Sequence, residues 1–119
     1  MEQPSPAVVH IDYVEFPVTD VAQAKKFYGD VFGWTFEDYG DAYTSFDCGN
    51  LTGGFAKAAE VHRGGGPLIV LYGKDLNELQ GRVIAAGGKI VRDTFDFPGG
   101  KRFHFTDPSG NELAVWSEQ

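Results

Sequence analysis

The sequence predicts an α+β protein made of two successive βαβββ modules. Hydrophobic periodicity over residues 10–58 indicates a strand, a helix and three further strands, and the same order recurs over residues 67–118. The residues that begin and end the helices recur as well. Asp20-Val21 corresponds to Asp75-Leu76 at the two helix starts, and a glycine follows each helix. The chain has 119 residues, and half of it is too small to bury a stable core alone. We therefore expect the two modules to share one core.

The first module begins with an alternating segment, HIDYVEFPV, over residues 10–18, which is typical of a strand with one apolar face. Thr19 or Asp20 can cap the helix that follows, because either side chain accepts hydrogen bonds from free amide groups. Apolar residues at helical spacing then continue to Gly33, which is typical of a helix end. Turn residues divide the rest into three predicted strands, over 34–39, 42–48 and 51–57.

The second module follows a polar, glycine-rich linker over residues 58–66. Its first strand is LIVLYG, and Asp75 caps a helix whose apolar face we expect to carry Leu76, Leu79, Val83 and Ile84, until Gly87-Gly88 ends it. Three strands are predicted over 89–95, 101–106 and 111–117. The intervening DFPGG over 96–100 is rich in glycine, and we expect it to hang over a binding site as a lid. Residues 1–9 are predicted to be a loose tail.

Composition excludes several functional classes. Hydrophobic residues make up 42% and charged residues 23%, which is typical of a globular protein. The net charge of -7 disfavours binding to the phosphate backbone of nucleic acids. No apolar run is long enough to cross a bilayer, so no membrane association is expected. Cys48 is the single cysteine, which excludes an intrachain disulfide and favours the reducing cytoplasm.

Three segments carry a resemblance to a known family: VEFPVTDVAQAKKFYGDVFGW, LNELQGRVIAAGGKIV and the ending FTDPSGNELAVW. With them the sequence resembles the vicinal oxygen chelate superfamily, also described as the glyoxalase/bleomycin-resistance/dioxygenase group. The resemblance implies sheets that curl into a cup around a small-molecule ligand, with the helices outside. Since members of the family are often dimers, it also implies a homodimer.

The resemblance further predicts where metal-dependent relatives carry His, Gln or Glu ligands. Matched motif by motif, these four positions are Tyr13, Gly53, Leu68 and Ala114. A first-row metal needs several nitrogen or carboxylate donors, and three of these side chains have none. We therefore expect no metal and no cofactor, which argues against the metal-dependent chemistry of glyoxalase I and extradiol dioxygenases.

Strand alternation predicts which side chains line the cup rather than face the helices. Most come from the first, fourth, fifth and eighth strands: Tyr13, Glu15, Phe55, Leu68, Val70, Tyr72, Glu112 and Trp116. His104, three residues before the aspartate of the DPSG turn, stands where the family often has a polar active-site residue, and Arg102 shares its face. A carboxylate such as Glu112 beside His104 would make an acid–base pair. His10 and His62 are given no role.

Three functions are compatible with this pattern. The first is a metal-independent binding protein whose aromatic and acidic cup holds a cationic or aromatic compound, as in the bleomycin-resistance relatives. The second is a lyase or isomerase that uses His104 with a carboxylate, or with an unusual metal site. The third is an interaction module whose cup is closed by its own side chains.

Overall fold

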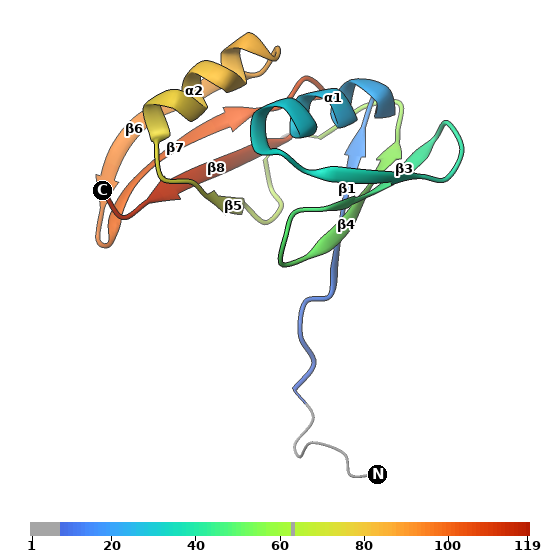
Figure 1. Cartoon of the computed structure of the whole chain (residues 1–119), viewed down its shortest axis with the longest axis horizontal. Coiled ribbons are helices and arrows are strands. Elements are labelled where there is room, and N and C mark those ends of the chain that lie inside the picture. Colours follow the sequence, from blue (N-terminus) through green and yellow to red (C-terminus); the bar gives the residue numbers. More distant parts are fainter. Residues whose placement is uncertain (1–7, 63) are drawn as a thin grey trace.

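A computed structural model describes residues 8–62 and 64–119, so the predicted tail lies mostly outside the described residues. The first module comprises β1 (Tyr13–Val18), α1 (Val21–Phe32), β2 (Thr35–Asp38), β3 (Tyr43–Asp47) and β4 (Thr52–Lys57). The second comprises β5 (Ile69–Tyr72), α2 (Leu76–Ala85), β6 (Lys89–Phe97), β7 (Gly100–Thr106) and β8 (Glu112–Ser117). The predicted order of elements is thus observed (Figure 1).

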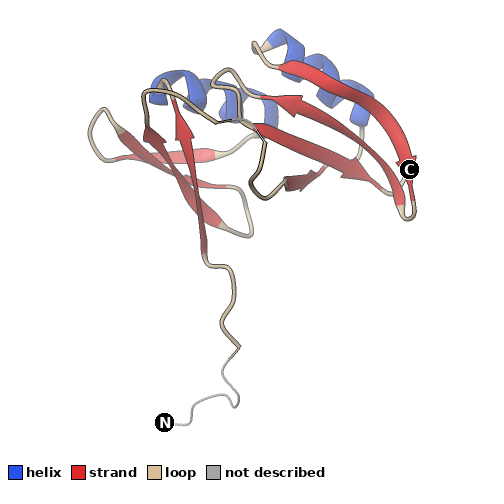
Figure 2. Ribbon diagram, turned by 180° about the vertical axis from the view of Figure 1, so that it is seen from behind, coloured by secondary structure: helices blue, strands red, loops and turns tan. Residues whose placement is uncertain are grey.

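The strands form two mixed four-stranded sheets with the same topology. Their orders are β1-β4-β3-β2 and β5-β8-β7-β6, and in each sheet the first strand of the module runs parallel to the last. Both helices lie on the same side of the two sheets (Figure 2). The predicted α+β class is therefore confirmed, and the repeat in the sequence corresponds to a repeat in topology.

The helix boundaries follow from their capping residues. Asp20 caps α1 by accepting a hydrogen bond from the Gln23 amide at 3.0 Å, and Gly33 ends the helix in the left-handed conformation at φ 76°. Asp75 caps α2 in the same way. The expected inward position of Ile84 is wrong: this residue is 59% exposed, and within α2 only Leu76 and Val83 are buried.

The core of the first module is a cluster of aromatic rings. Tyr28 stacks on Trp34 with 4.8 Å between ring centroids, and Trp34 stacks on Phe46 at 4.6 Å. Phe55 lies in this cluster, 4.9 Å from the Tyr28 ring, and is fully buried on the helix side of the sheet. Its predicted place in the cup is therefore wrong. Phe55 is level with Phe16 of β1, and side chains level on paired strands share a face.

The turn between β7 and β8 joins the two modules. Asp107 Oδ1 accepts hydrogen bonds from the amides of residues 109, 110 and 111 at 2.9 Å, while Oδ2 accepts one from the Tyr28 hydroxyl at 2.8 Å. Asn111 donates to the carbonyl oxygen of Pro17 at 2.8 Å. Burial raises the pKa of both Tyr28 and Asp107. The DPSGN segment therefore has a structural role, because it fixes β8 against the first module.

The predicted lid is absent from the described residues, since β6 extends to Phe97 and β7 begins at Gly100. The two strands are joined by Pro98 and by Gly99, whose φ of 124° suits a tight turn. Within the described part of the chain, no helix is long and apolar enough to span a membrane.

Candidate functional site

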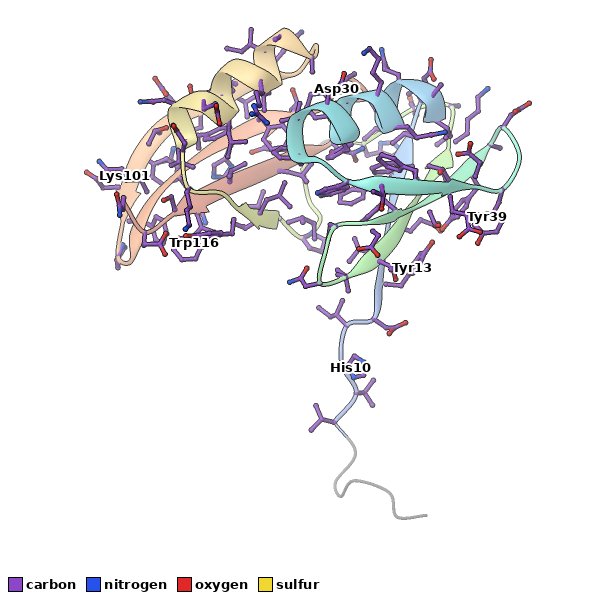
Figure 3. All side chains as sticks on the ribbon, in the orientation of Figure 1. His10, Tyr13, Asp30, Tyr39, Lys101 and Trp116 are labelled. Atoms are coloured by element: carbon purple, nitrogen blue, oxygen red, sulfur yellow. The ribbon has the colours of Figure 1, made fainter. Side chains whose placement is uncertain are left out.

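The face of the two sheets away from the helices forms the cup. In the first sheet Glu15 is level with Gly54, which is level with Ser45; in the second, Val70 is level with Ala114, which is level with His104. Tyr13 of the first module and Trp116 of the second project on this side (Figure 3). The predicted cup residues other than Phe55 stand on this face or at its rim.

His104 and Glu112 form the predicted pair. The Nδ1 atom of His104 lies 3.0 Å from Oε2 of Glu112, across the neighbouring strands β7 and β8. The His104 residue is only 8% exposed, whereas the Glu112 carboxylate reaches solvent. Its other ring nitrogen, Nε2, is buried and has no hydrogen-bond partner among the described residues. The carboxylate thus fixes the orientation of the imidazole ring and leaves Nε2 unpartnered.

A cavity of about 500 Å³ adjoins this pair, which is within the size range of small-ligand sites. It is lined by His104 and Glu112 from the second module, by Glu15 from β1, and by Leu68 just before β5. The structure therefore brings four of the predicted site residues to one cavity. His62 and Asn111 also line it. Sequence reasoning gave neither a role, and the linker position of His62 carried no signal.

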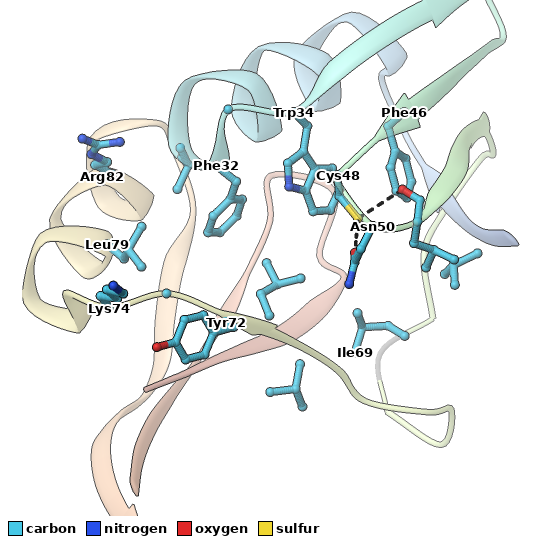
Figure 4. A pocket seen from close by; sticks show the side chains of 18 of the residues that line it. Phe32, Trp34, Phe46, Cys48, Asn50, Ile69, Tyr72, Lys74, Leu79 and Arg82 are labelled. Carbon is cyan, nitrogen blue, oxygen red and sulfur yellow. Dashed lines mark hydrogen bonds between the residues drawn. The ribbon is translucent and has the colours of Figure 1, made fainter. Parts of the chain in front are cut away.

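A second, larger cleft of about 1130 Å³ lies between the modules (Figure 4). It is lined by Phe32, Trp34 and Phe46 from the first module and by Ile69, Tyr72 and Leu79 from the second. Val70 and Tyr72, predicted for the cup, border this cleft rather than the His104 cavity. The cleft's apolar lining comes mainly from the edges of the two cores, so we take the His104 cavity as the candidate site.

The positions that hold a metal in relatives do not fit one here. The fourth-strand position is Gly54 rather than the predicted Gly53, because Gly54 shares the cup face whereas Gly53 is level with Val14 on the helix face. A Cβ at Gly54 would overlap the Tyr43 hydroxyl and come within 2.7 Å of the Tyr13 hydroxyl. These two hydroxyls hydrogen-bond to each other across Gly54. Two tyrosines thus fill the space that a ligand side chain would need.

The positions on the fifth and eighth strands, Leu68 and Ala114, also carry no side chain that could bind a metal. Ala114 is level with Val70 on the cup face, and Leu68 precedes β5. Among residues 8–62 and 64–119, no three His, Cys, Asp or Glu side chains gather as a group that could hold a metal ion. Partial burial raises the pKa of Tyr43, with Tyr13 and Glu15 adding to the effect, so the Tyr43 phenol is neutral at physiological pH.

A second set of polar and aromatic side chains lies further along the cup face of the second sheet. Arg102 is level with Trp116, which is level with Tyr72, and the Tyr72 and Trp116 rings meet edge to face at 5.1 Å. On the outer strand, Arg92 is level with His104 and Phe95 with Arg102. Sequence reasoning missed Arg92 and Phe95. Phe95 lies three positions after Arg92 on β6, whereas their partners Arg102 and His104 lie two positions apart on β7. This register shift, and another between Ile90 and Arg92, break the alternation on which the prediction relied.

The duplicated βαβββ topology, with a polar and aromatic cup opposite the helices, defines a glyoxalase-like protein. Residues 10–115 match the family model of the Glyoxalase/Bleomycin resistance protein/Dioxygenase superfamily, and the chain belongs to that superfamily. Membership supports a glyoxalase-like small-molecule-binding protein.

Individual relatives are more distant. The anthracycline biosynthesis protein DauV of Streptomyces sp. (strain C5) is 32% identical over 117 residues, covering 82% of this chain and 42% of DauV. The chain therefore spans less than half the length of the curated relatives it matches.

Solved structures show the same fold. A glyoxalase/bleomycin resistance protein/dioxygenase family enzyme from Burkholderia phytofirmans PsJN has a TM-score of 0.80 at 19% identity, covering 92% of this chain and 100% of that one. The fosfomycin resistance protein FosX from Mesorhizobium loti has a TM-score of 0.77 at 16% identity, covering 92% of each chain. At these identities the likeness is one of fold alone.

Proposed function

We propose that the protein binds a small molecule with a flat, aromatic body in its cup, without a metal. The observation that carries the proposal is the cavity of about 500 Å³ that holds the His104–Glu112 pair together with Glu15 and Leu68. Such a site combines apolar walls with a few oriented polar groups, as ligand sites usually do. Trp116 and Tyr72 extend the aromatic surface beyond the cavity.

The misfit at the metal positions supports metal independence, since Gly54 is covered by two tyrosine hydroxyls and Ala114 carries no donor atom. Exposure of the cup residues Tyr13, Val70 and Tyr72 speaks against a cup closed by its own side chains. Exposed apolar groups on one face also favour covering by a second copy. The homodimer stays a prediction that these exposed groups favour. The cytoplasmic location stays a prediction from the sequence.

Tryptophan fluorescence tests this proposal. In a Trp34→Phe background, Trp116 is the single tryptophan, so its emission reports on the cup. Titration of EDTA-dialysed protein with 2-naphthol, a neutral flat probe, is expected to change that emission saturably. Calorimetry should show the binding lost in Trp116→Ala and kept in Tyr39→Ala, since Tyr39 is an exposed aromatic in the turn between β2 and β3. Binding that appears only after a divalent metal is added, or no binding at all, would contradict the proposal.

The His104–Glu112 pair favours a second candidate, a lyase or isomerase that transfers a proton. If Nδ1 donates to Glu112, then Nε2 is the atom free to accept a proton from a substrate. The Phe95 ring lies 5.8 Å from the imidazole, and Nε2 is closed to solvent, so turnover would require side chains near it to move.

Proton exchange tests this candidate without a known substrate. In D2O, catalysed loss of the methyl proton signal of pyruvate or of the α-carbon proton signal of lactate is expected for the native protein and not for His104→Ala. Equal exchange by both proteins, with circular dichroism showing both folded, would remove His104 from the chemistry.

A further inference from the structure

A basic and aromatic cluster stands on the cup face of the second sheet, beside the His104 cavity. It consists of Arg92, Phe95, Arg102 and His104, and we call it the arginine cluster. Two register shifts in β6 create it, one between Ile90 and Arg92 and one between Arg92 and Phe95, because the extra residues place both Arg92 and Phe95 level with cup-facing residues of β7. The cluster therefore depends on the fold rather than on sequence spacing.

Both guanidinium groups are placed by aromatic rings rather than by carboxylates. The Cζ atom of Arg92 lies 3.6 Å from the centroid of the Phe95 ring. Arg102 Cζ lies 5.4 Å from the same centroid and 5.8 Å from that of Phe97. Packing against a ring face orients a guanidinium and leaves its N–H edge available for hydrogen bonds.

The two arginines of the cluster lack a counter-charge among the described residues. Among the described residues, neither Arg92 nor Arg102 forms an ion pair, although the chain carries 17 acidic and 10 basic residues. Glu112 is engaged by His104 Nδ1, and Asp96 pairs with Lys101. Two buried nitrogen atoms, Arg102 Nε and His104 Nε2, have no partner within residues 8–62 and 64–119. Arg102 Nε is always a donor, and a buried donor without an acceptor is costly, so a bound acceptor would be favoured beside it.

We propose that the arginine cluster binds an anionic oxygen group of the ligand, while its aromatic body lies against Trp116 and Tyr72. The strand register supports this orientation of the ligand. Arg102 on β7 is level with Trp116 on β8, and Trp116 is level with Tyr72 on β5. The expected ligand class is therefore an aromatic acid, which differs from the cationic compound that net charge and the acidic residues of the first module suggest. This inference rests on the proposed function, since it assigns the polarity of a ligand in the same cup.

Three matched probes separate the two proposals: anionic 2-naphthoate, neutral 2-naphthamide and cationic 2-naphthylmethylamine. Naphthyl phosphate is added to compare a phosphoryl group with the carboxylate. Calorimetry on the full chain is expected to show 2-naphthoate binding at least about tenfold more tightly than the amide, as a charge-assisted hydrogen bond implies. Arg92→Gln and Arg102→Gln should each remove most of this preference. Lys26→Gln on α1 removes one positive charge outside the cup and should leave it unchanged. Preference of the phosphate over 2-naphthoate would support the site and assign it to phosphoryl groups.

The Nε–H resonance of Arg102 gives a readout that a loss of folding cannot imitate. It is expected to shift downfield when 2-naphthoate binds to the native protein, and not when the amide binds. Equal affinities for acid and amide, or tighter binding of the amine, would overturn the anion site and leave small-molecule binding in the cup intact. Binding of none of the probes would overturn both proposals.

Discussion

The hydrogen bond between Tyr28 and Asp107 is expected to hold the two modules together, and a double-mutant cycle can measure it. The Tyr28 hydroxyl is fully buried and donates to Asp107 Oδ2 at 2.8 Å across the boundary between the modules. Tyr28→Phe deletes this one donor and keeps the stacking on Trp34. A buried hydrogen bond to a charged group contributes about 1.5–3 kcal/mol, which is the expected loss in the free energy of unfolding.

Asp107→Ala should cost more, about 3–5 kcal/mol, because it leaves the buried Tyr28 hydroxyl without an acceptor and removes the acceptor of three turn amides. If the two groups act through their shared hydrogen bond, the double variant will be less destabilised than the sum of the single variants. The coupling energy should then be about 1.5–3 kcal/mol.

Urea denaturation followed by circular dichroism measures all four proteins. Tyr39→Phe serves as the control, since this exposed tyrosine should change the free energy of unfolding by less than about 0.5 kcal/mol. A coupling energy below about 0.5 kcal/mol would refute the reasoning, because the two side chains would then contribute independently.

Three further predictions concern single elements. Asp75→Ala removes the cap of α2 and should cost about 1 kcal/mol, measured by urea denaturation, whereas Asp75→Ser should restore most of the loss. Gly33→Ala places an alanine in the left-handed backbone conformation at φ 76°, and the added Cβ meets open space. Backbone strain alone should therefore lower the free energy of unfolding by about 1 kcal/mol. An unchanged free energy of unfolding would show that the helix end adjusts. The hydrogen bond from Tyr72 to Glu118 raises the pKa of that phenol, so Glu118→Gln should lower it toward about 10 in a titration of ultraviolet absorbance, corrected with Tyr72→Phe. Because the folded pKa is the higher one, the stability that accompanies this shift is present below pH of about 10 and is lost as the pH rises through the folded pKa; an unshifted titration in Glu118→Gln would contradict the assignment.

Part of the candidate site could be predicted because its residues lie on regular strands. Alternation in β1 correctly separated Val14, Phe16 and Val18 from the cup face. The same parity on β7 and β8 put His104 and Glu112 on one face, and the structure places them 3.0 Å apart. Their role in binding or catalysis stays a prediction.

The errors lie where alternation carries no information. In β4, Gly53 and Gly54 have no side chains to mark a face, so the sequence left the parity of Phe55 open. Pairing with β1 sets that parity and places Phe55 in the core. In β6 two register shifts change which face Arg92 and Phe95 occupy, and the residue types of the strand do not indicate them.

The sequence by itself determined the two βαβββ modules, their capping residues and the family, because periodicity, helix caps and glycine turns are local properties of the chain. Tertiary structure alone decided which side chains meet: the tyrosine pair over Gly54, the Asp107 turn against Tyr28, and the arginine cluster beside His104. These contacts depend on strand register and on the packing of one module against the other, and both are set by interactions between residues far apart in the chain.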